Sequence, residues 1–220
     1  MDFRETSDGL IYSNDSVLIF FGKKTCTLER LQALYPEFIF RGVKQTHSNI
    51  SIKSFEGSDA IEADAHWTQE KNIALLIKTA DCLPIMIYQP ESKSIMAIHA
   101  GWRGVANQAT PLSIEKLNSA QSFEIFIGPH IMQNSFEVQD DAKELLMSSA
   151  NPLASEQYLK QENGRMFIDL EKIVFQQLSP FKIKNIKSTK IDTKTNPDFH
   201  SYRRDSQNSG RNLSFICLST

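Results

Sequence analysis

Short apolar runs separated by polar, turn-rich segments dominate this chain. Runs of strand length that end at Gly, Pro, Asn, Asp or Ser are typical of β-strands. The pattern predicts strands over 17–21, 37–43, 50–55, 73–78, 83–88, 94–98, 123–127, 183–191 and 213–218.

A smaller number of segments have a helical pattern, and these lie over 29–35, 105–118, 140–150 and 169–178. Thr27 and Asp169 are expected as N-caps, because a side-chain oxygen at that position accepts a free backbone N–H. Pro111 is expected to kink or restart the second helix, with Thr110 as a cap. The acidic segment 56–66 is expected to be a loop.

Strands and helices are mixed, and hairpins replace strict β-α-β alternation. This order is typical of the α+β class, with mixed, largely antiparallel sheets. No repeat and no low-complexity linker marks a boundary, so we expect a single domain over residues 1–220.

Composition narrows the class of protein. The 220 residues are 40% apolar and 23% charged, with a formal charge of −2. These values are ordinary for a globular protein and give no reason to expect a nucleic-acid partner. No apolar run is long enough to span a membrane, and the N-terminus has no signal-peptide pattern. We expect a cytoplasmic protein, and the sequence does not fix its oligomeric state.

The stretch from Thr79 to Gly104 carries the first chemical signal. Its two apolar runs, 83–88 and 94–98, flank a polar turn and predict a hairpin. Cys82 precedes the first run and His99 follows the second, so both side chains are expected at the same open end. The other cysteines, Cys26 and Cys217, are expected to be buried thiols.

A second histidine lies at a comparable place. His47 follows Lys44-Gln45-Thr46 in a polar loop between two predicted strands. One Cys with two His is a known ligand set for catalytic zinc, which keeps a further position open for water or substrate. The spacing fits no compact metal motif, so a solvated His47 stays an alternative. His66, near Asp64, is expected to be exposed and without a role.

Polar residues around these three suggest supporting roles. Asp81, beside Cys82, could orient a ligand or handle protons. Gly101 and Gly104 allow close backbone approach, the following helix start favours an anion, and Arg103 could contact a phosphate. A second basic set in the tail contains Arg203 and Arg211, which by themselves are expected on the solvated surface.

The motifs KQTH, TADCLPI, HAGWRG and SYRRD with GRN, in this order, resemble the bacterial YfiH-like family. Its members are described as laccase-domain or multicopper polyphenol oxidases and as purine nucleoside phosphorylases. The resemblance implies a layered α/β/β/α fold and a catalytic zinc held by His47, Cys82 and His99. Asp81 is then expected to take part in catalysis.

The resemblance also implies substrates. It implies phosphorolysis of adenosine, inosine, guanosine and S-methyl-5′-thioadenosine, and deamination of adenosine, a reaction that other zinc enzymes perform on adenine. Inorganic phosphate or substrate would be bound by Gln45, Arg103, Arg203 and Arg211. Phe136 departs from the family, which often has Tyr there.

Three alternatives stay open. A multicopper oxidase needs many more imidazoles than the five histidines of this chain provide, although a single bound copper is compatible with the ligand set. A metal-free hydrolase with Cys82 as nucleophile and His99 as base would fit editing of peptidoglycan precursors. The last alternative is a binding module without turnover.

Overall fold

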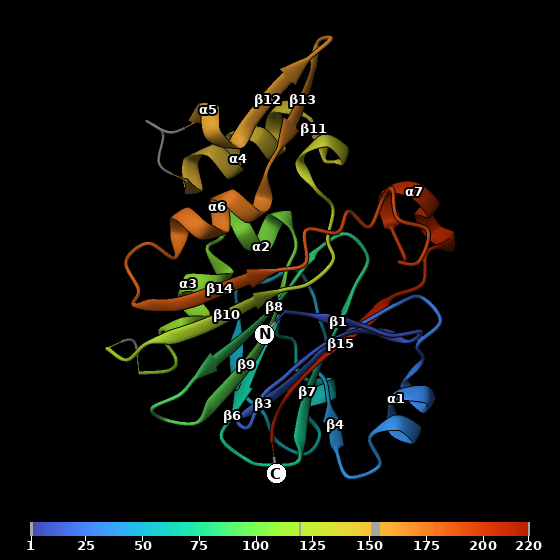
Figure 1. Cartoon of the computed structure of the whole chain (residues 1–220). Coiled ribbons are helices and arrows are strands. Elements are labelled where there is room, and N and C mark those ends of the chain that lie inside the picture. The colour runs from blue at the N-terminus through green and yellow to red at the C-terminus, as the bar shows by residue number, and fades with distance from the viewer. Residues whose placement is uncertain (1, 119, 151–154, 220) are drawn as a thin grey trace.

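Two six-stranded sheets packed face to face form the centre of the protein (Figure 1). The computed structural model describes residues 2–118, 120–150 and 155–219. The first sheet has the order β1-β2-β3-β15-β7-β4. Its strands are β1 (Arg4–Glu5), β2 (Gly9–Ser13), β3 (Val17–Gly22), β15 (Asn212–Leu218), β7 (Ile73–Thr79) and β4 (Ile39–Arg41).

The second sheet carries the hairpin predicted from the sequence. Its order is β14-β10-β8-β9-β6-β5. The strands are β14 (Ile183–Ser188), β10 (Phe123–Ile127), β8 (Leu83–Gln89), β9 (Ser94–Ala100), β6 (Ala65–Thr68) and β5 (Ser51–Lys53). Only β4–β7, β10–β14 and β5–β6 pair in parallel within the two sheets as described. The predicted α+β class with largely antiparallel sheets is therefore confirmed.

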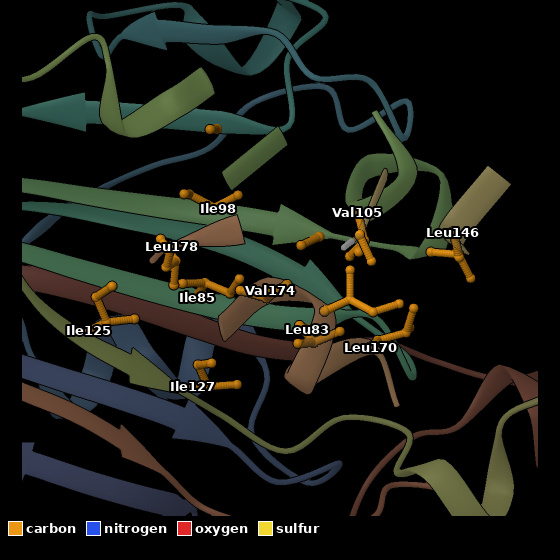
Figure 2. Close-up of a cluster of buried hydrophobic side chains, with 14 of the residues drawn as sticks. Leu83, Ile85, Ile98, Val105, Ile125, Ile127, Leu146, Leu170, Val174 and Leu178 are labelled. Carbon is orange, nitrogen blue, oxygen red and sulfur yellow. The ribbon is translucent and has the colours of Figure 1, made fainter. Parts of the chain in front are cut away.

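Helices cover the outer face of each sheet, which gives the predicted α/β/β/α layers. Helix α1 (Leu28–Leu34) lies on the first sheet and packs through Leu31 against Phe20 and Phe215. The second sheet is covered by α2 (Trp102–Ala106), α3 (Ala109–Ile114), α4 (Asp140–Ser149) and α6 (Leu170–Gln177). Figure 2 shows the core on this side, where Ile85 and Ile98 lie beside Val174 and Leu178.

Strands β8 and β9 are buried on both faces, which explains their uninterrupted apolar runs. Leu83, Ile85 and Ile87 belong to the core under the helices, whereas Met86 and Tyr88 belong to the core between the sheets. The hairpin, including its open end, is thereby held between two hydrophobic layers.

The remaining elements lie beside this sandwich. A three-stranded sheet, β11-β13-β12, projects at the top of Figure 1, away from the two larger sheets. It consists of β11 (Glu137–Val138), β12 (Leu159–Glu162) and β13 (Arg165–Ile168), next to α5 (Ser155–Tyr158). Short helices complete the description: η1 (Ser58–Ala60), η2 (Gln133–Ser135), α7 (Tyr202–Asp205) and η4 (Ser206–Asn208). No helix in the described ranges combines the length and apolarity of a membrane span.

Two of the predicted helix caps form, whereas one predicted helix is divided at a different residue from the one expected. Thr27 accepts a hydrogen bond from the Arg30 N–H, and Asp169 accepts one from Lys172. The helix predicted over 105–118 is interrupted, as Pro111 indicated, but the break lies earlier than predicted, between α2 and α3. The break is at Gln108, whose φ of 55° is left-handed and which is the N-cap in place of Thr110. Pro111 lies in the first turn of α3, where a backbone N–H has no acceptor within the helix, so a proline there removes no helical hydrogen bond.

The prediction that 56–66 is a loop is wrong at its last two residues, and the prediction of an exposed His66 is wrong as well. Strand β6 begins at Ala65, and its pairing with β9 places His66 opposite Ala97. The side chain of His66 is 0% exposed. Neither ring nitrogen makes a hydrogen bond within the described residues. Strand β6 has only four residues and follows an acidic segment, so it is too short for an alternation of apolar and polar residues to reveal it in the sequence.

Candidate metal centre

The hairpin brings Cys82 and His99 to one end of the second sheet, as the pattern predicted. Pro84 pairs with His99 and Leu83 with Ala100, so Cys82 immediately precedes the strand opposite His99. His99 is buried, whereas Cys82 is only partly buried. The antiparallel ladder therefore sets the separation of these two side chains.

His47 reaches the same point from the loop between β4 and β5. Its Nε2 lies 3.9 Å from the Cys82 Sγ, and its ring centre lies 4.8 Å from that of His99. One donor atom from each of the three residues falls within 4.8 Å of the other two. The three residues named from the sequence converge in space.

The donor set fits a zinc-type ion. At tetrahedral zinc, bonds of about 2.3 Å to sulfur and 2.0–2.1 Å to nitrogen place the two donors about 3.6 Å apart. The 3.9 Å between Cys82 Sγ and His47 Nε2 is close to this value. Imidazole and thiolate also suit copper. The remaining histidines, His66, His130 and His200, lie outside the group.

Gly101 is required by the approach of two ligands. A Cβ at this position would lie 2.7 Å from His47 Cδ2 and 2.9 Å from Cys82 Sγ, closer than van der Waals contact allows. A Cβ at Gly104 would meet nothing nearer than 3.5 Å. The first glycine of HAGWRG thus makes room for two of the three converging donor side chains. Helix α2 is too short for the anion site that was expected at its start.

Asp64 is a functional candidate that the sequence did not reveal. It is 1% exposed, and its Oδ1 lies 2.7 Å from His99 Nδ1. Its carboxylate also accepts backbone N–H groups of the loop that carries His47. The Asp64-Ala65-His66 pattern had directed attention to His66, although Asp64 is the residue that reaches the centre.

Electrostatics distinguish Cys82 from the other two cysteines. Burial alone would raise the pKa of the Cys82 thiol, but His99 and His47 beside it lower the pKa below its usual range. Burial raises the pKa of Cys26 to about 11 and that of Cys217 to about 12. Cys82 is thus the thiol of the three with thiolate character, which both metal binding and nucleophilic attack require.

The carboxylate and the imidazole of the centre favour each other's charged form. Burial would lower the pKa of His99, but the neighbouring Cys82 and Asp64 raise it. For Asp64, burial is outweighed by hydrogen bonds from His99 and Ser48, which hold its pKa at about 2. Asp64 is therefore ionised at neutral pH and acts only as an acceptor.

Asp81 and Gln45 make hydrogen bonds to other residues of the protein. Asp81, with a left-handed φ of 85°, accepts hydrogen bonds from Thr193 Oγ1 at 2.7 Å and from the Arg203 N–H at 2.6 Å. Gln45 exchanges two 2.8 Å hydrogen bonds with the backbone of Lys78 at the end of β7. These contacts support a positioning role for each residue.

A cavity of about 820 Å³ opens over the centre. Arg103, Arg203 and Arg211 all line it, so the tail arginines face the cavity although they are exposed. The Arg103 guanidinium stacks 4.4 Å from the Trp102 ring, and that of Arg203 lies 5.3 Å from Phe136. The cavity combines a metal-type donor set with cationic and aromatic walls.

Residues 26–219 match the family described as multi-copper polyphenol oxidoreductase laccase. The chain belongs to this family. Several relatives carry a different description. A purine nucleoside phosphorylase of Clostridium acetobutylicum is 32% identical over 181 residues, covering 79% of this chain and 75% of that protein. One of Rickettsia conorii is 31% identical over 202 residues, covering 89% and 82%.

Solved structures of other bacterial proteins share the fold. The Bacillus licheniformis hypothetical protein YfiH superposes with a TM-score of 0.87 at 22% identity and covers 98% of both chains. A Neisseria meningitidis protein superposes with a TM-score of 0.82 at 21% identity, over 100% of both. The YfiH-like resemblance predicted from the motifs is confirmed. A trinuclear copper cluster would need additional histidines at the centre, and among the described residues only His47 and His99 lie there.

Proposed function

We propose that this protein is a zinc-dependent purine nucleoside phosphorylase that also deaminates adenosine. The observation that carries the proposal is the convergence of His47, Cys82 and His99 at a cavity lined by arginines. The names of the two relatives, at about 30% identity, support the phosphorylase activity. Adenosine, inosine, guanosine and S-methyl-5′-thioadenosine are the proposed substrates.

His47, Cys82 and His99 would hold the ion. When bound, zinc supplies a Lewis acid that polarises an oxygen ligand and lowers the pKa of a coordinated water toward neutrality. Cys82 enters this set as a thiolate, which its lowered pKa favours. The Asp64 carboxylate holds His99 by its Nδ1 and leaves Nε2 to face the other donors.

The arginines would bind and orient inorganic phosphate. In phosphorolysis a phosphate oxygen bonds to C1′ of the ribose while the bond from C1′ to N9 of the base breaks, and the base leaves with a proton. Arg103 and Arg203 present guanidinium groups to the cavity, and these groups match a phosphate in charge and hydrogen-bonding geometry. Arg211 is proposed as a further contact.

Aromatic and apolar side chains would hold the base and exclude water around it. Trp102, Phe136 and Tyr202 line the cavity beside the arginines, and flat rings stack on purines. In deamination, water would replace the amino group at C6 of adenine and give inosine and ammonia. Asp81 is proposed to keep Arg203 in place through its hydrogen bond to the Arg203 N–H.

Product analysis on adenosine tests the proposal. Zinc-loaded protein is incubated with adenosine with and without phosphate, and metal-stripped protein is the control. Ribose 1-phosphate that appears only with phosphate supports phosphorolysis, and inosine supports deamination. If protein with stoichiometric zinc forms neither ribose 1-phosphate nor inosine, the proposal is contradicted.

A second candidate rests on the low pKa of Cys82 and its 3.9 Å contact with His47. A thiolate beside an imidazole is also the arrangement of a cysteine hydrolase, which would act on peptidoglycan precursors. Alkylation of Cys82 distinguishes the two candidates. Protection by zinc, with activity lost on chelation, favours the metal enzyme. Full activity in chelated protein, lost on alkylation, favours the hydrolase.

A further inference from the structure

Asp64 contacts both elements that deliver histidines to the centre. Its Oδ1 lies 2.7 Å from His99 Nδ1 and accepts the His47 N–H at 3.0 Å. Its Oδ2 accepts the N–H and the hydroxyl of Ser48 at 2.6 and 2.7 Å, and the Thr46 N–H at 3.2 Å. One buried carboxylate thus makes five hydrogen bonds, all to residues in or beside the ligand set.

The backbone of Asp64 is fixed independently of its side chain. Its carbonyl accepts the His99 N–H at 2.7 Å, and its own N–H donates to Ile50 at 3.0 Å. Asp64 immediately precedes β6, which pairs with β9. The carboxylate is therefore presented from a rigid point of the second sheet.

We propose that Asp64 is the positioning residue of the metal centre, whose single carboxylate fixes both the His99 ring and the loop turn that presents His47. This inference rests on the metal site of the proposed function. It assigns to Asp64 a role toward the ligands and not toward the nucleoside.

The chemistry of an ionised carboxylate specifies what this contact does to His99. The carboxylate can only accept, so His99 Nδ1 must carry a proton. The lone pair at Nε2 is then free for a metal, and the carboxylate raises the basicity of that nitrogen. Asp64 thereby selects the tautomer that can bind the ion.

For His47 the effect is on the backbone. Its φ of 61° lies in the left-handed region, which is strained for a residue other than glycine. The N–H groups of Thr46, His47 and Ser48 all point to the Asp64 carboxylate. These hydrogen bonds hold the strained turn in the conformation that aims His47 at Cys82.

Asp64→Asn is the sharpest test because it keeps the shape and removes one acceptor oxygen. Three donors surround Oδ2, so the amide oxygen is expected there, and the NH₂ group is expected to face His99 and the His47 N–H, which loses its acceptor. His99 Nδ1 would then become an acceptor, and the ring proton would move to Nε2. We expect the zinc dissociation constant to rise about 10- to 100-fold.

Spectroscopy separates this effect from general destabilisation. Zinc-loaded wild-type protein labelled with ¹⁵N at histidine should show a downfield Nδ1 proton on His99, and cobalt-substituted protein should show a sulfur-to-metal band. We expect both signals to change in Asp64→Asn. Ser48→Ala is the matched control, because it removes one hydrogen bond from the same carboxylate and leaves His99 untouched. Its zinc dissociation constant should stay within roughly threefold of wild type.

An unchanged zinc dissociation constant and an unchanged cobalt spectrum in Asp64→Asn would overturn the inference. If that variant does not fold, the wild-type spectrum decides: a His99 Nδ1 without a proton in the zinc form overturns it, and a protonated Nδ1 supports it. Wild-type protein that binds no zinc would overturn the metal site together with this inference. Tight zinc binding without phosphorolysis would overturn only the proposed function.

Discussion

The hairpin β8–β9 and the loop that carries His47 supply side chains to the same candidate metal centre but are held by different interactions. In the hairpin, seven residue pairs are in register, and every residue of both strands is buried. In the loop, His47 is exposed and left-handed, and a carboxylate from another segment binds its backbone.

This difference teaches where the centre is robust and where it is sensitive. A backbone ladder inside a hydrophobic core does not depend on any one polar side chain. The loop depends on Asp64 and Gln45, so single substitutions there should misplace His47 while the fold persists. Substitutions in the hairpin and in the loop test that contrast, and one at His66 tests the layer between the sheets, from the largest expected effect to the smallest.

Cys82→Ala should abolish function and leave the hairpin intact. Loss of a bound metal removes several kcal/mol of charge stabilisation, a factor on the order of 10³ in rate. Zinc content and phosphorolysis should both collapse, while thermal unfolding stays close to that of wild type. Cys26→Ala, at a buried thiol remote from the ligands, should retain zinc and activity. A Cys82→Ala protein with full zinc content would contradict the assignment.

His66→Leu should reduce the loss of unfolding free energy that the wild-type protein shows as the pH falls. Burial lowers the pKa of His66 from 6.5 to about 4. Between these pH values the unfolded chain binds a proton that the folded protein does not, so stability falls as the pH falls. The total is about 3 kcal/mol at 1.36 kcal/mol per pH unit.

Urea unfolding at pH 7.5 and pH 5 measures this effect. The unfolding free energy of wild-type protein should fall more steeply toward pH 5 than that of His66→Leu. Equal slopes would show that His66 does not titrate between the folded and unfolded states as burial implies.

Gly101→Ala, directly after strand β9 of the hairpin, should weaken the affinity for zinc. The new Cβ would lie 2.7 Å from the His47 ring and 2.9 Å from Cys82 Sγ, so the ligands must move apart. Overpacking of this kind costs roughly 1–3 kcal/mol, which we expect as a 10- to 100-fold weaker zinc affinity measured by chelator competition. Gly104→Ala, whose Cβ meets its nearest neighbour at 3.5 Å, is the matched control and should bind zinc normally. Equal affinities for the two variants would contradict this account.

Gln45→Ala should have the smallest effect, because it releases only one of two anchors of the loop. Two hydrogen bonds to Lys78 are lost, worth about 1 kcal/mol net, so we expect a roughly fivefold weaker zinc affinity. Gln69→Ala, which removes a hydrogen bond to Ser92 on the exposed surface, should change nothing at the centre. A larger effect for Gln45 than for Gly101 would reverse the proposed ranking.

A sequence prediction is accurate when the feature depends on residues that are neighbours in the chain. Runs buried on both faces, such as 83–88, are continuous and therefore visible in the sequence. The end of such a hairpin is also predictable, which is why Cys82 and His99 were paired correctly. The helix over 105–118 was misplaced because a left-handed Gln108 carries no compositional mark.

The sequence by itself determined the long buried strands, the capped helices and the three candidate donor residues, since these depend on nearest-neighbour chemistry and on motif residues, whereas short strands such as β2, β6 and β12 were missed. Only the tertiary structure decided that Asp64 joins His99 to the His47 loop, that His66 is buried and that the tail arginines face the cavity. Each of these depends on pairing between strands far apart in the chain. A side chain's environment is set by such pairing and cannot be read from its neighbours in sequence.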